Sequence, residues 1–320
     1  MEPLLEVRGL STYFQLAHGT IKAVDGVDFS LGNGETLAIV GESGCGKSVT
    51  AYSIMRLVMP PGRIESGEVL FNSRDLMGLA EKEMQGLRGN QISMIFQEPM
   101  TSLNPVLTVG RQIAEGLMLH RGLSGDDALA EVIEILRQVG IPSPAARFSD
   151  YPHQMSGGMR QRVVIAMALA CNPRLLIADE PTTALDVTIQ AQILELIDRM
   201  KESSGMGLIL ITHDLGIVAE RAGNTAIMYA GRILEYAETA EIFRNPLHPY
   251  TQGLLDSLPQ NSAPGMPLNT ISGQVPELLS DLKGCGFCER CPKKEWRCRE
   301  EKPAMTEVGA GHQVRCWKFQ

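Results

Sequence analysis

The chain has 320 residues, a hydrophobic fraction of 44%, a charged fraction of 21% and a formal net charge of −8, which is typical of a globular protein of about two domains. The negative charge argues against a general nucleic-acid-binding protein, because such proteins usually carry a basic excess. No apolar run approaches the roughly 18 residues of a membrane span, and the N-terminus has no basic region followed by an apolar stretch. We therefore expect a cytoplasmic chain that reaches a membrane only through partners.

The first third of the sequence carries a phosphate-binding loop. Short apolar runs predict strands at 4–7, 24–31, 36–40, 68–71 and 91–96. Directly after the third strand, residues 41–48 read Gly-Glu-Ser-Gly-Cys-Gly-Lys-Ser, a complete Walker A pattern, and a helix is expected over 49–59. The loop's N–H groups cradle phosphates, its lysine reaches the β- and γ-phosphates, and its serine hydroxyl binds Mg²⁺. We expect a nucleotide to bind at Gly41, Ser43, Gly44, Cys45, Gly46, Lys47 and Ser48.

The middle of the chain is predicted to be helical, from about residue 105 to 171. Apolar residues recur there at helical spacing, at Ala128, Val132, Ile135, Leu136 and Val139. We interpret this block as a helical subdomain inserted into a nucleotide-binding core. Buried parallel strands are expected after it at 175–178 and 208–211, and then a hairpin over 226–236.

Two carboxylates end the strand predicted at 175–178. Asp179 suits Mg²⁺, because a hard cation prefers oxygen ligands. Glu180 suits the activation of a water for in-line attack on a γ-phosphate. Alone, the pair would indicate an ordinary acidic turn; after a full Walker A loop it predicts a nucleoside triphosphatase.

Ser156-Gly157-Gly158 with its flanks resembles the signature motif of the ATP-binding-cassette (ABC) ATPases. In that family each ATP is held between Walker A of one subunit and the signature of the other, in a head-to-tail dimer. A serine and glycine N–H groups at a helix N-terminus suit this second phosphate cradle. The signature departs from the common pattern at Met155 and Met159, and neither change removes a phosphate-binding group.

Other positions match the same family in chain order. The resemblance implies that Gln97 senses Mg²⁺ and the attacking water, that Asp186 ends the D-loop Ala184-Leu185-Asp186, and that His213 contacts the γ-phosphate. It also implies that Phe14 stacks on adenine, with Tyr13 as the alternative. The expected catalytic set is thus Glu180, His213 and Gln97, and the expected Mg²⁺ ligands are Ser48, Gln97 and Asp179.

Two phrases resemble one branch of the family, the oligopeptide and dipeptide importers. They are residues 97–105, Gln-Glu-Pro-Met-Thr-Ser-Leu-Asn-Pro, and residues 248–251, His-Pro-Tyr-Thr. The resemblance implies an α/β fold: a RecA-like P-loop cassette with an antiparallel β subdomain, an inserted helical subdomain and a small Cys-rich C-terminal extension. We expect the nucleotide-binding domain over 1–258, its helical subdomain at about 98–172, and the extension over 259–320.

The same resemblance implies an ATP-hydrolysing subunit that energises uptake of di- or oligopeptides. Its expected partners are a second cassette subunit, identical or different, two transmembrane permeases and an extracytoplasmic substrate-binding protein, and not nucleic acid. The expected location is the cytoplasmic face of the cell membrane, where a permease would dock along residues 97–103, including Leu103. The alternatives are an importer of nickel or another small solute, or a soluble ABC ATPase without a transport role.

Five of the seven cysteines lie in the last 36 residues, a pattern that suggests metal ligation in a cytoplasmic chain. By resemblance to the peptide-importer branch, Cys285, Cys291, Cys298 and Cys316 are the expected ligands of a [4Fe–4S] cluster. Four thiolates would also suit Zn²⁺. Cys288 is a fifth cysteine that offers an alternative ligand pair.

Overall fold

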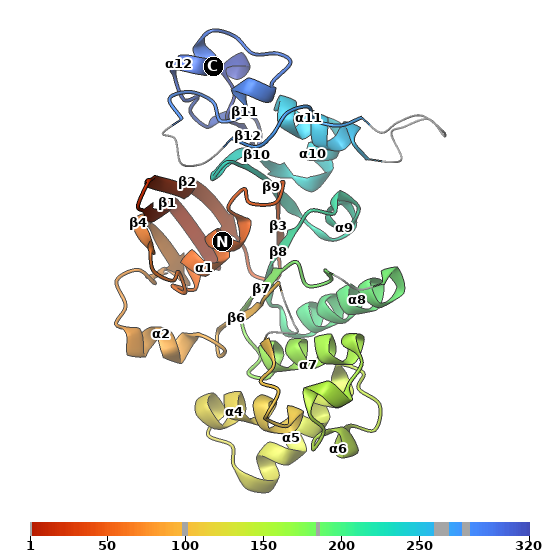
Figure 1. Cartoon of the computed structure of the whole chain (residues 1–320). Helices are drawn as coiled ribbons and strands as arrows, with labels where there is room; N and C mark the ends of the chain where they lie inside the picture. Colours follow the sequence, from red (N-terminus) through yellow and green to blue (C-terminus); the bar gives the residue numbers. More distant parts are fainter. Residues whose placement is uncertain (1, 98–101, 184–185, 259–268, 277–281) are drawn as a thin grey trace. The chain divides into compact units, whose positions relative to one another are not determined.

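The computed structural model describes residues 2–97, 102–183, 186–258, 269–276 and 282–320. The chain forms two compact units. The first comprises Met1–Leu31, Thr36–Met77 and Leu210–Gln320, and the second comprises Gly32–Glu35 and Gly78–Ile209. The chain passes from the second unit to the first within strand β8 (Gly207–Thr212) (Figure 1).

An antiparallel four-stranded sheet belongs to the first unit and has the order β2-β1-β4-β5. Its strands are β1 (Leu5–Leu16), β2 (Gly19–Leu31), β4 (Gly62–Phe71) and β5 (Arg74–Asp75). Leu5 lies opposite Leu31 on one side and Phe71 on the other, and all three are buried. β1 is longer than the strand predicted at 4–7, because Gly9, with a φ of +57°, lies in a register irregularity after which pairing resumes.

A second group of strands in the first unit leads into the Walker A loop. β3 (Thr36–Val40) is buried along its whole length and pairs in parallel with β9 (Asn224–Tyr229). β9 turns at Ala230 and Gly231, which both have positive φ, into the antiparallel strand β10 (Arg232–Glu238). The predicted hairpin is therefore confirmed. β12 (His312–Val314) and β11 (Thr306–Gly309) continue the pairing with residues from the tail.

The helices of the first unit are short: α1 (Lys47–Ile54), α9 (Leu215–Arg221), α10 (Thr239–Arg244), α11 (Pro249–Asp256) and α12 (Arg297–Glu300). Three rings join α11, β9 and the tail in one core. Tyr250 lies 4.6 Å from Tyr229 and 5.3 Å from Phe287 between ring centroids, and all three side chains are fully buried. The Cys-rich tail therefore packs into the core of the first unit.

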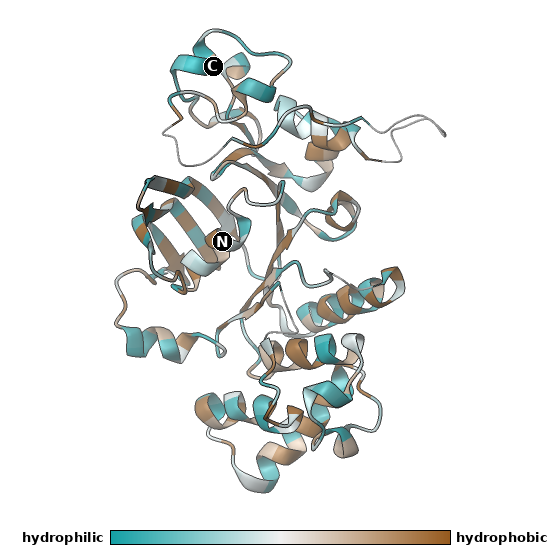
Figure 2. Ribbon diagram, viewed as in Figure 1, coloured by the Kyte–Doolittle hydropathy of each residue, from teal (hydrophilic) through white to brown (hydrophobic). Residues whose placement is uncertain are grey.

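The second unit is mainly helical. Its two parallel strands are β6 (Ile92–Ile95) and β7 (Leu175–Asp179). Its helices are α2 (Glu81–Leu87), α4 (Val109–Arg121), α5 (Gly125–Gln138), α6 (Pro144–Arg147), α7 (Gly157–Leu169) and α8 (Val187–Ser204). Figure 2 shows apolar and polar residues alternating along α8. The residues predicted to form an apolar helix face, from Ala128 to Val139, are all buried. None of the helices formed by the described residues is both long and apolar enough to cross a bilayer.

Candidate nucleotide-binding site

The Walker A loop connects β3 to α1 and requires glycine at two positions. A Cβ on Gly41 would meet the carbonyl oxygen of Met228 at 2.1 Å, and a Cβ on Gly46 would meet that of Ala23 at 2.2 Å. Gly46 also has a φ of +110°, which L side chains rarely adopt. The loop therefore wraps closely against neighbouring backbone. α1 ends at Ile54, so the helix predicted to continue to residue 59 is too long; the chain turns before the prolines at 60 and 61, which a helix interior disfavours.

Lys47 lies inside this loop. Its side chain is buried, and Nζ donates to the carbonyl oxygens of Gly41 at 2.7 Å and Glu42 at 3.1 Å. Cys45 is fully buried beside it, and burial raises the pKa of its thiol. The Cys45 thiol is therefore neutral at pH 7, and the residue contributes its backbone N–H and its packing to the loop. Lys47 supplies the positive charge at the place where phosphates bind in such loops.

Phe14 and Tyr13 differ in their surroundings on β1. The Tyr13 hydroxyl donates to Asp25 at 3.0 Å, and Asp25 also pairs with Arg232 at 2.6 Å. Burial alone would raise the pKa of Asp25, but the hydrogen bonds and charge of Arg232 hold it below its usual value. The ring of half-buried Phe14 lies over Gly62, where a Cβ would meet it at 2.5 Å. Tyr13 is thus tied into its own sheet, which leaves Phe14 as the better candidate for adenine stacking.

His213 follows β8 directly and is exposed, at the start of the turn into α9. Asp214 caps that helix, because its Oδ1 accepts from the backbone N–H groups of Gly216 at 2.8 Å and Ile217 at 3.3 Å. The capping interaction fixes the chain next to His213. Phe14, the Walker A loop and His213 all belong to the first unit.

Gln97 and Glu180 meet in the second unit. β6 and β7 are parallel with Ile95 opposite Ala178, so the residues that follow them lie at the same edge. Gln97 Nε2 donates to Glu180 Oε2 at 3.4 Å, and Thr183 Oγ1 donates to the same oxygen at 2.9 Å. Asp179 is fully buried at the end of β7. Glu180 has a φ of +46°, a strained conformation of the kind that clusters at functional sites.

Ser156 and Asp186 both cap helices of the second unit. Ser156 Oγ accepts from the N–H of Met159 at 3.3 Å at the start of α7, and Asp186 Oδ1 accepts from that of Ile189 at 3.0 Å at the start of α8. Ser156 and Gly157 are exposed, and a Cβ on Gly157 would meet no described atom within 4 Å. At Gly158, by contrast, an added Cβ would meet Ile189 Cγ2 at 3.2 Å. The signature thus presents an open helix N-terminus, which suits anion binding.

Parts of two predicted motifs lie outside the described residues: 98–101 of the phrase at 97–105, and Ala184 and Leu185 of the D-loop. Leu103 is described and is only 4% exposed, so the expectation that it offers an apolar docking surface is wrong. It is a core residue. Val106, three positions further on, is 75% exposed and is the better candidate for such a contact.

The five tail cysteines line one cavity of about 20 Å³, together with Phe287, His248 and Trp317. That volume suits about one water molecule. Burial raises the pKa of the Cys285 thiol to about 12. Within the part of the chain that the structure describes, no three or more His, Cys, Asp or Glu side chains are arranged to hold a metal ion. The cysteines predicted as ligands therefore gather at one place but do not form a ligand set.

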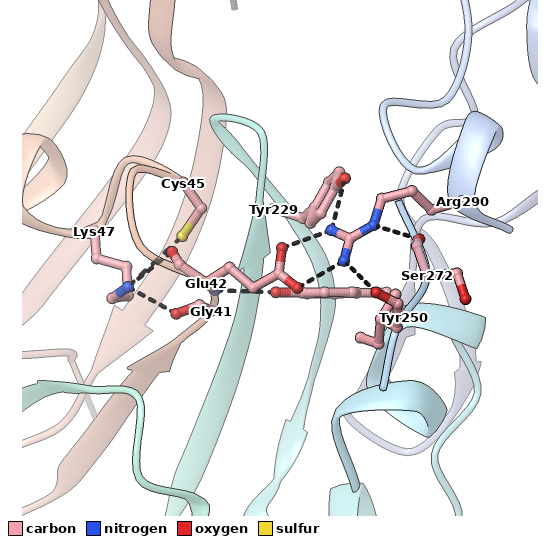
Figure 3. Close-up of polar contacts among 9 residues, drawn as sticks. Gly41, Glu42, Cys45, Lys47, Tyr229, Tyr250, Ser272 and Arg290 are labelled. Atoms are coloured by element: carbon pink, nitrogen blue, oxygen red, sulfur yellow. Dashed lines mark hydrogen bonds and ion pairs between the residues drawn. The ribbon is translucent and has the colours of Figure 1, made fainter. Parts of the chain in front are cut away.

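One contact of the Walker A loop was missed by sequence reasoning. Arg290, in the tail, pairs with Glu42, the second residue of the loop, and Tyr250 accepts from the Glu42 N–H at 3.0 Å (Figure 3). In the sequence, residues 248–251 indicated only a resemblance to the peptide importers, and not a contact with the Walker A loop. Nothing in the sequence around Arg290, which lies between Cys288 and Cys291, indicates a contact with that loop either. A partner 248 positions away along the chain cannot be found from spacing.

Comparison with known proteins defines the class. Residues 24–183 match the family described as ABC transporter, and residues 234–298 match the oligopeptide/dipeptide transporter, C-terminal region. A dimeric ATP-binding cassette in a post-hydrolysis state with ADP and Pi matches with a TM-score of 0.66 and 27% identity over 73% of this chain and 98% of its own. The chain belongs to the ABC transporter family and has the fold of its ATPase cassette.

Two relatives within this family are similar to nearly the whole chain. The dipeptide transport ATP-binding protein DppD of Bacillus subtilis (strain 168) is 52% identical over 99% of this chain and 95% of its own length. The oligopeptide transport ATP-binding protein OppD of the same organism is also 52% identical, over 98% of this chain and 88% of its own. The similarity therefore covers the tail as well as the cassette.

Proposed function

We propose that this chain is the ATP-hydrolysing subunit of an ABC importer that energises uptake of di- and oligopeptides through separate permease subunits. The observation that carries the proposal is similarity over the full chain, tail included, to ATP-binding proteins of dipeptide and oligopeptide transport. The cassette alone would support an ATPase; the match at 234–298 favours peptides as the transported solute. We take 1–258 as the nucleotide-binding domain and 259–320 as its extension.

The reaction is hydrolysis of ATP, with Mg²⁺ neutralising phosphate charge when it is bound. The Walker A N–H groups and Lys47 bind the phosphates, and Phe14 stacks on the adenine. Ser48, Gln97 and Asp179 would hold the Mg²⁺. Glu180 accepts a proton from the attacking water, and its contact with Gln97 keeps its carboxylate oriented. His213 contacts the γ-phosphate.

A second cassette completes each site. Ser156, Gly157, Gly158 and Asp186 act on the nucleotide bound by the partner, because the exposed N-terminus of α7 provides a phosphate cradle that its own Walker A does not need. Dimeric cassettes among the similar solved structures support this arrangement. Two permeases and an extracytoplasmic binding protein complete the importer, and the chain works at the cytoplasmic face of the membrane.

We also propose a [4Fe–4S] cluster on Cys285, Cys291, Cys298 and Cys316, with Zn²⁺ as the alternative. The proposal is supported by the shared cavity that these side chains line. The present cavity is small and its thiols are not arranged as ligands, so a bound cluster would need a wider cavity and deprotonated thiols. No step of ATP hydrolysis depends on this group.

Deleting the gene and measuring growth on di- and oligopeptides as the only source of a required amino acid tests the proposed function. We expect growth on peptides to fail while growth on the free amino acid continues. Unimpaired growth on peptides, together with lost nickel uptake, would assign the chain to a metal importer instead. Unimpaired uptake of both would favour an ATPase without a transport role.

A further inference from the structure

The Arg290 guanidinium forms a two-point ion pair with the Glu42 carboxylate. Nη1 donates to Oε2 at 2.6 Å and Nη2 donates to Oε1 at 3.0 Å (Figure 3). The Arg290 side chain is 7% exposed and that of Glu42 is 27% exposed. A two-point pair of this kind fixes orientation as well as distance. It joins the tail directly to the Walker A loop.

Arg290 is itself held in place by groups other than Glu42. Nε donates to the carbonyl oxygen of Ser272 at 3.1 Å, and Nη2 donates to that of Ile271 at 3.1 Å. Nη1 also donates to the Tyr229 hydroxyl at 3.3 Å. The guanidinium therefore has a fixed position set by the tail and by β9, and it determines where the Glu42 carboxylate lies.

Glu42 is held through its backbone too, and it contacts Lys47. The fully buried Tyr250 accepts from the Glu42 N–H at 3.0 Å, while the Glu42 carbonyl accepts from Lys47 Nζ at 3.1 Å. A chain of contacts thus runs from Arg290 through Glu42 to the lysine that binds phosphate. The Walker A pattern leaves position 42 variable, so phosphate binding does not itself require a glutamate there.

A negatively charged side chain at position 42 would oppose the binding of phosphate. The loop binds a polyanion, and a free negative charge next to it would repel the phosphates. The ion pair removes this repulsion, because it neutralises Glu42 and turns both carboxylate oxygens toward the tail.

We propose that Arg290 is a positioning residue for ATP binding: it neutralises Glu42 and holds the first half of the Walker A loop in its phosphate-binding conformation. The tail thereby takes part in nucleotide binding. This inference rests on nucleotide binding by the Walker A loop and is independent of which solute is transported.

The test is a charge-rescue series in the full chain: Arg290→Met, Glu42→Gln and the double variant. Arg297→Met is the matched control, because Arg297 lies in the same tail, stacks on Trp317 at 4.2 Å and is 44% exposed. The readouts are the Kd for ATP and for ADP, and the KM and kcat of hydrolysis. Thermal unfolding of each variant reports on folding.

We expect Arg290→Met to raise the Kd and KM for ATP by about tenfold, with a smaller change in kcat, since it leaves an unpaired charge beside the phosphates. The effect should be larger for ATP than for ADP, which carries less charge. Glu42→Gln should restore the Kd of Arg290→Met to within about threefold of wild type, because it removes the repelling charge. Arg297→Met should bind ATP as wild type does.

Rescue is the decisive outcome, because a purely structural role of Arg290 in the tail would not be repaired by changing Glu42. A double variant as weak as Arg290→Met, or an unchanged Kd in Arg290→Met, would overturn the proposal. If Arg290→Met does not fold, Arg290→Gln takes its place in the series, because its amide can still donate to a tail carbonyl oxygen but carries no charge to pair with Glu42. Its rise in Kd must then be removed by Glu42→Gln, and persistence of that rise would equally overturn the proposal.

Discussion

Replacing Glu180 by glutamine removes the proposed general base with little change to the fold. The amide has the same shape as the carboxylate, and its oxygen can still accept from Thr183 Oγ1 and Gln97 Nε2, which now contact Glu180 at 2.9 and 3.4 Å. Both donors bond the same carboxylate oxygen, so the single amide oxygen can accept from both and neither donor is left unpaired. The positive φ of Glu180 is a property of the backbone, and a change at the end of the side chain leaves it as it is.

The magnitude follows from the role. Loss of a general base typically slows turnover by about 10²–10⁴-fold, which corresponds to about 3–5 kcal/mol of activation free energy. We expect Glu180→Gln to bind ATP as wild type does, because Lys47 and the Walker A N–H groups belong to the other unit and are unchanged. The assay is steady-state ATP hydrolysis by the assembled transporter, with the Kd for ATP measured on the same preparation.

Glu195→Gln is the matched control, since Glu195 lies exposed on α8 in the same unit. It should hydrolyse ATP at the wild-type rate. Near-normal hydrolysis by Glu180→Gln would refute the assignment of the base. A parallel loss of ATP binding would mean that Glu180 has a structural role instead.

Further outcomes follow from the other sites. Ser156→Arg should leave ATP binding to the chain's own Walker A intact but abolish ATP-dependent association, measured by light scattering; association equal to wild type would contradict a role across the dimer. Val106→Asp, which places a charge on an exposed apolar position, should uncouple transport from ATP binding, whereas coupled transport would place the permease contact elsewhere. Anaerobically purified protein should be brown, with about four iron and four sulfide per chain, and serine at Cys285, Cys291, Cys298 or Cys316, but not at Cys288, should bleach it; colourless protein with one zinc would overturn the cluster. Asp25→Asn should lower the free energy of unfolding at pH 7 by about 1–2 kcal/mol. This difference should shrink as the pH falls from the ordinary Asp pKa of 3.8 toward the lowered pKa of Asp25 in the folded protein, because the stabilising carboxylate is then protonated. A difference in denaturation curves that does not depend on pH would exclude the ion pair with Arg232 as its cause.

The sequence pattern of neighbouring residues was enough to predict those parts of the fold that a single helix, strand or turn determines. The buried strand into the Walker A loop, the helix face from Ala128 to Val139 and the hairpin around Gly231 were predictable, because apolar periodicity and turn residues are properties of neighbouring positions. The length of β1 was not. Its polar residues Ser11 and Thr12 are buried between two partner strands, and the short apolar run gave no sign of that pairing.

The candidate site likewise has parts that neighbouring residues determine and parts that long-range packing determines. The phosphate loop, Asp179 at the end of β7 and Glu180 directly after it were found from order and spacing. Leu103 was misjudged because a leucine in a polar stretch has no mark that separates a core residue from a docking residue. The Arg290–Glu42 pair was missed because it depends on the packing of the tail, through Phe287, against β9 and α11, which only the three-dimensional structure reveals.

Uptake of a labelled di- or oligopeptide by deletion cells that carry either the wild-type chain or the Glu180→Gln variant tests the central claim most directly. The wild-type chain should restore ATP-dependent uptake, and Glu180→Gln should leave it at the level of the deletion. Equal peptide uptake in the deletion and in the complemented cells would contradict a role as the energising subunit of a peptide importer.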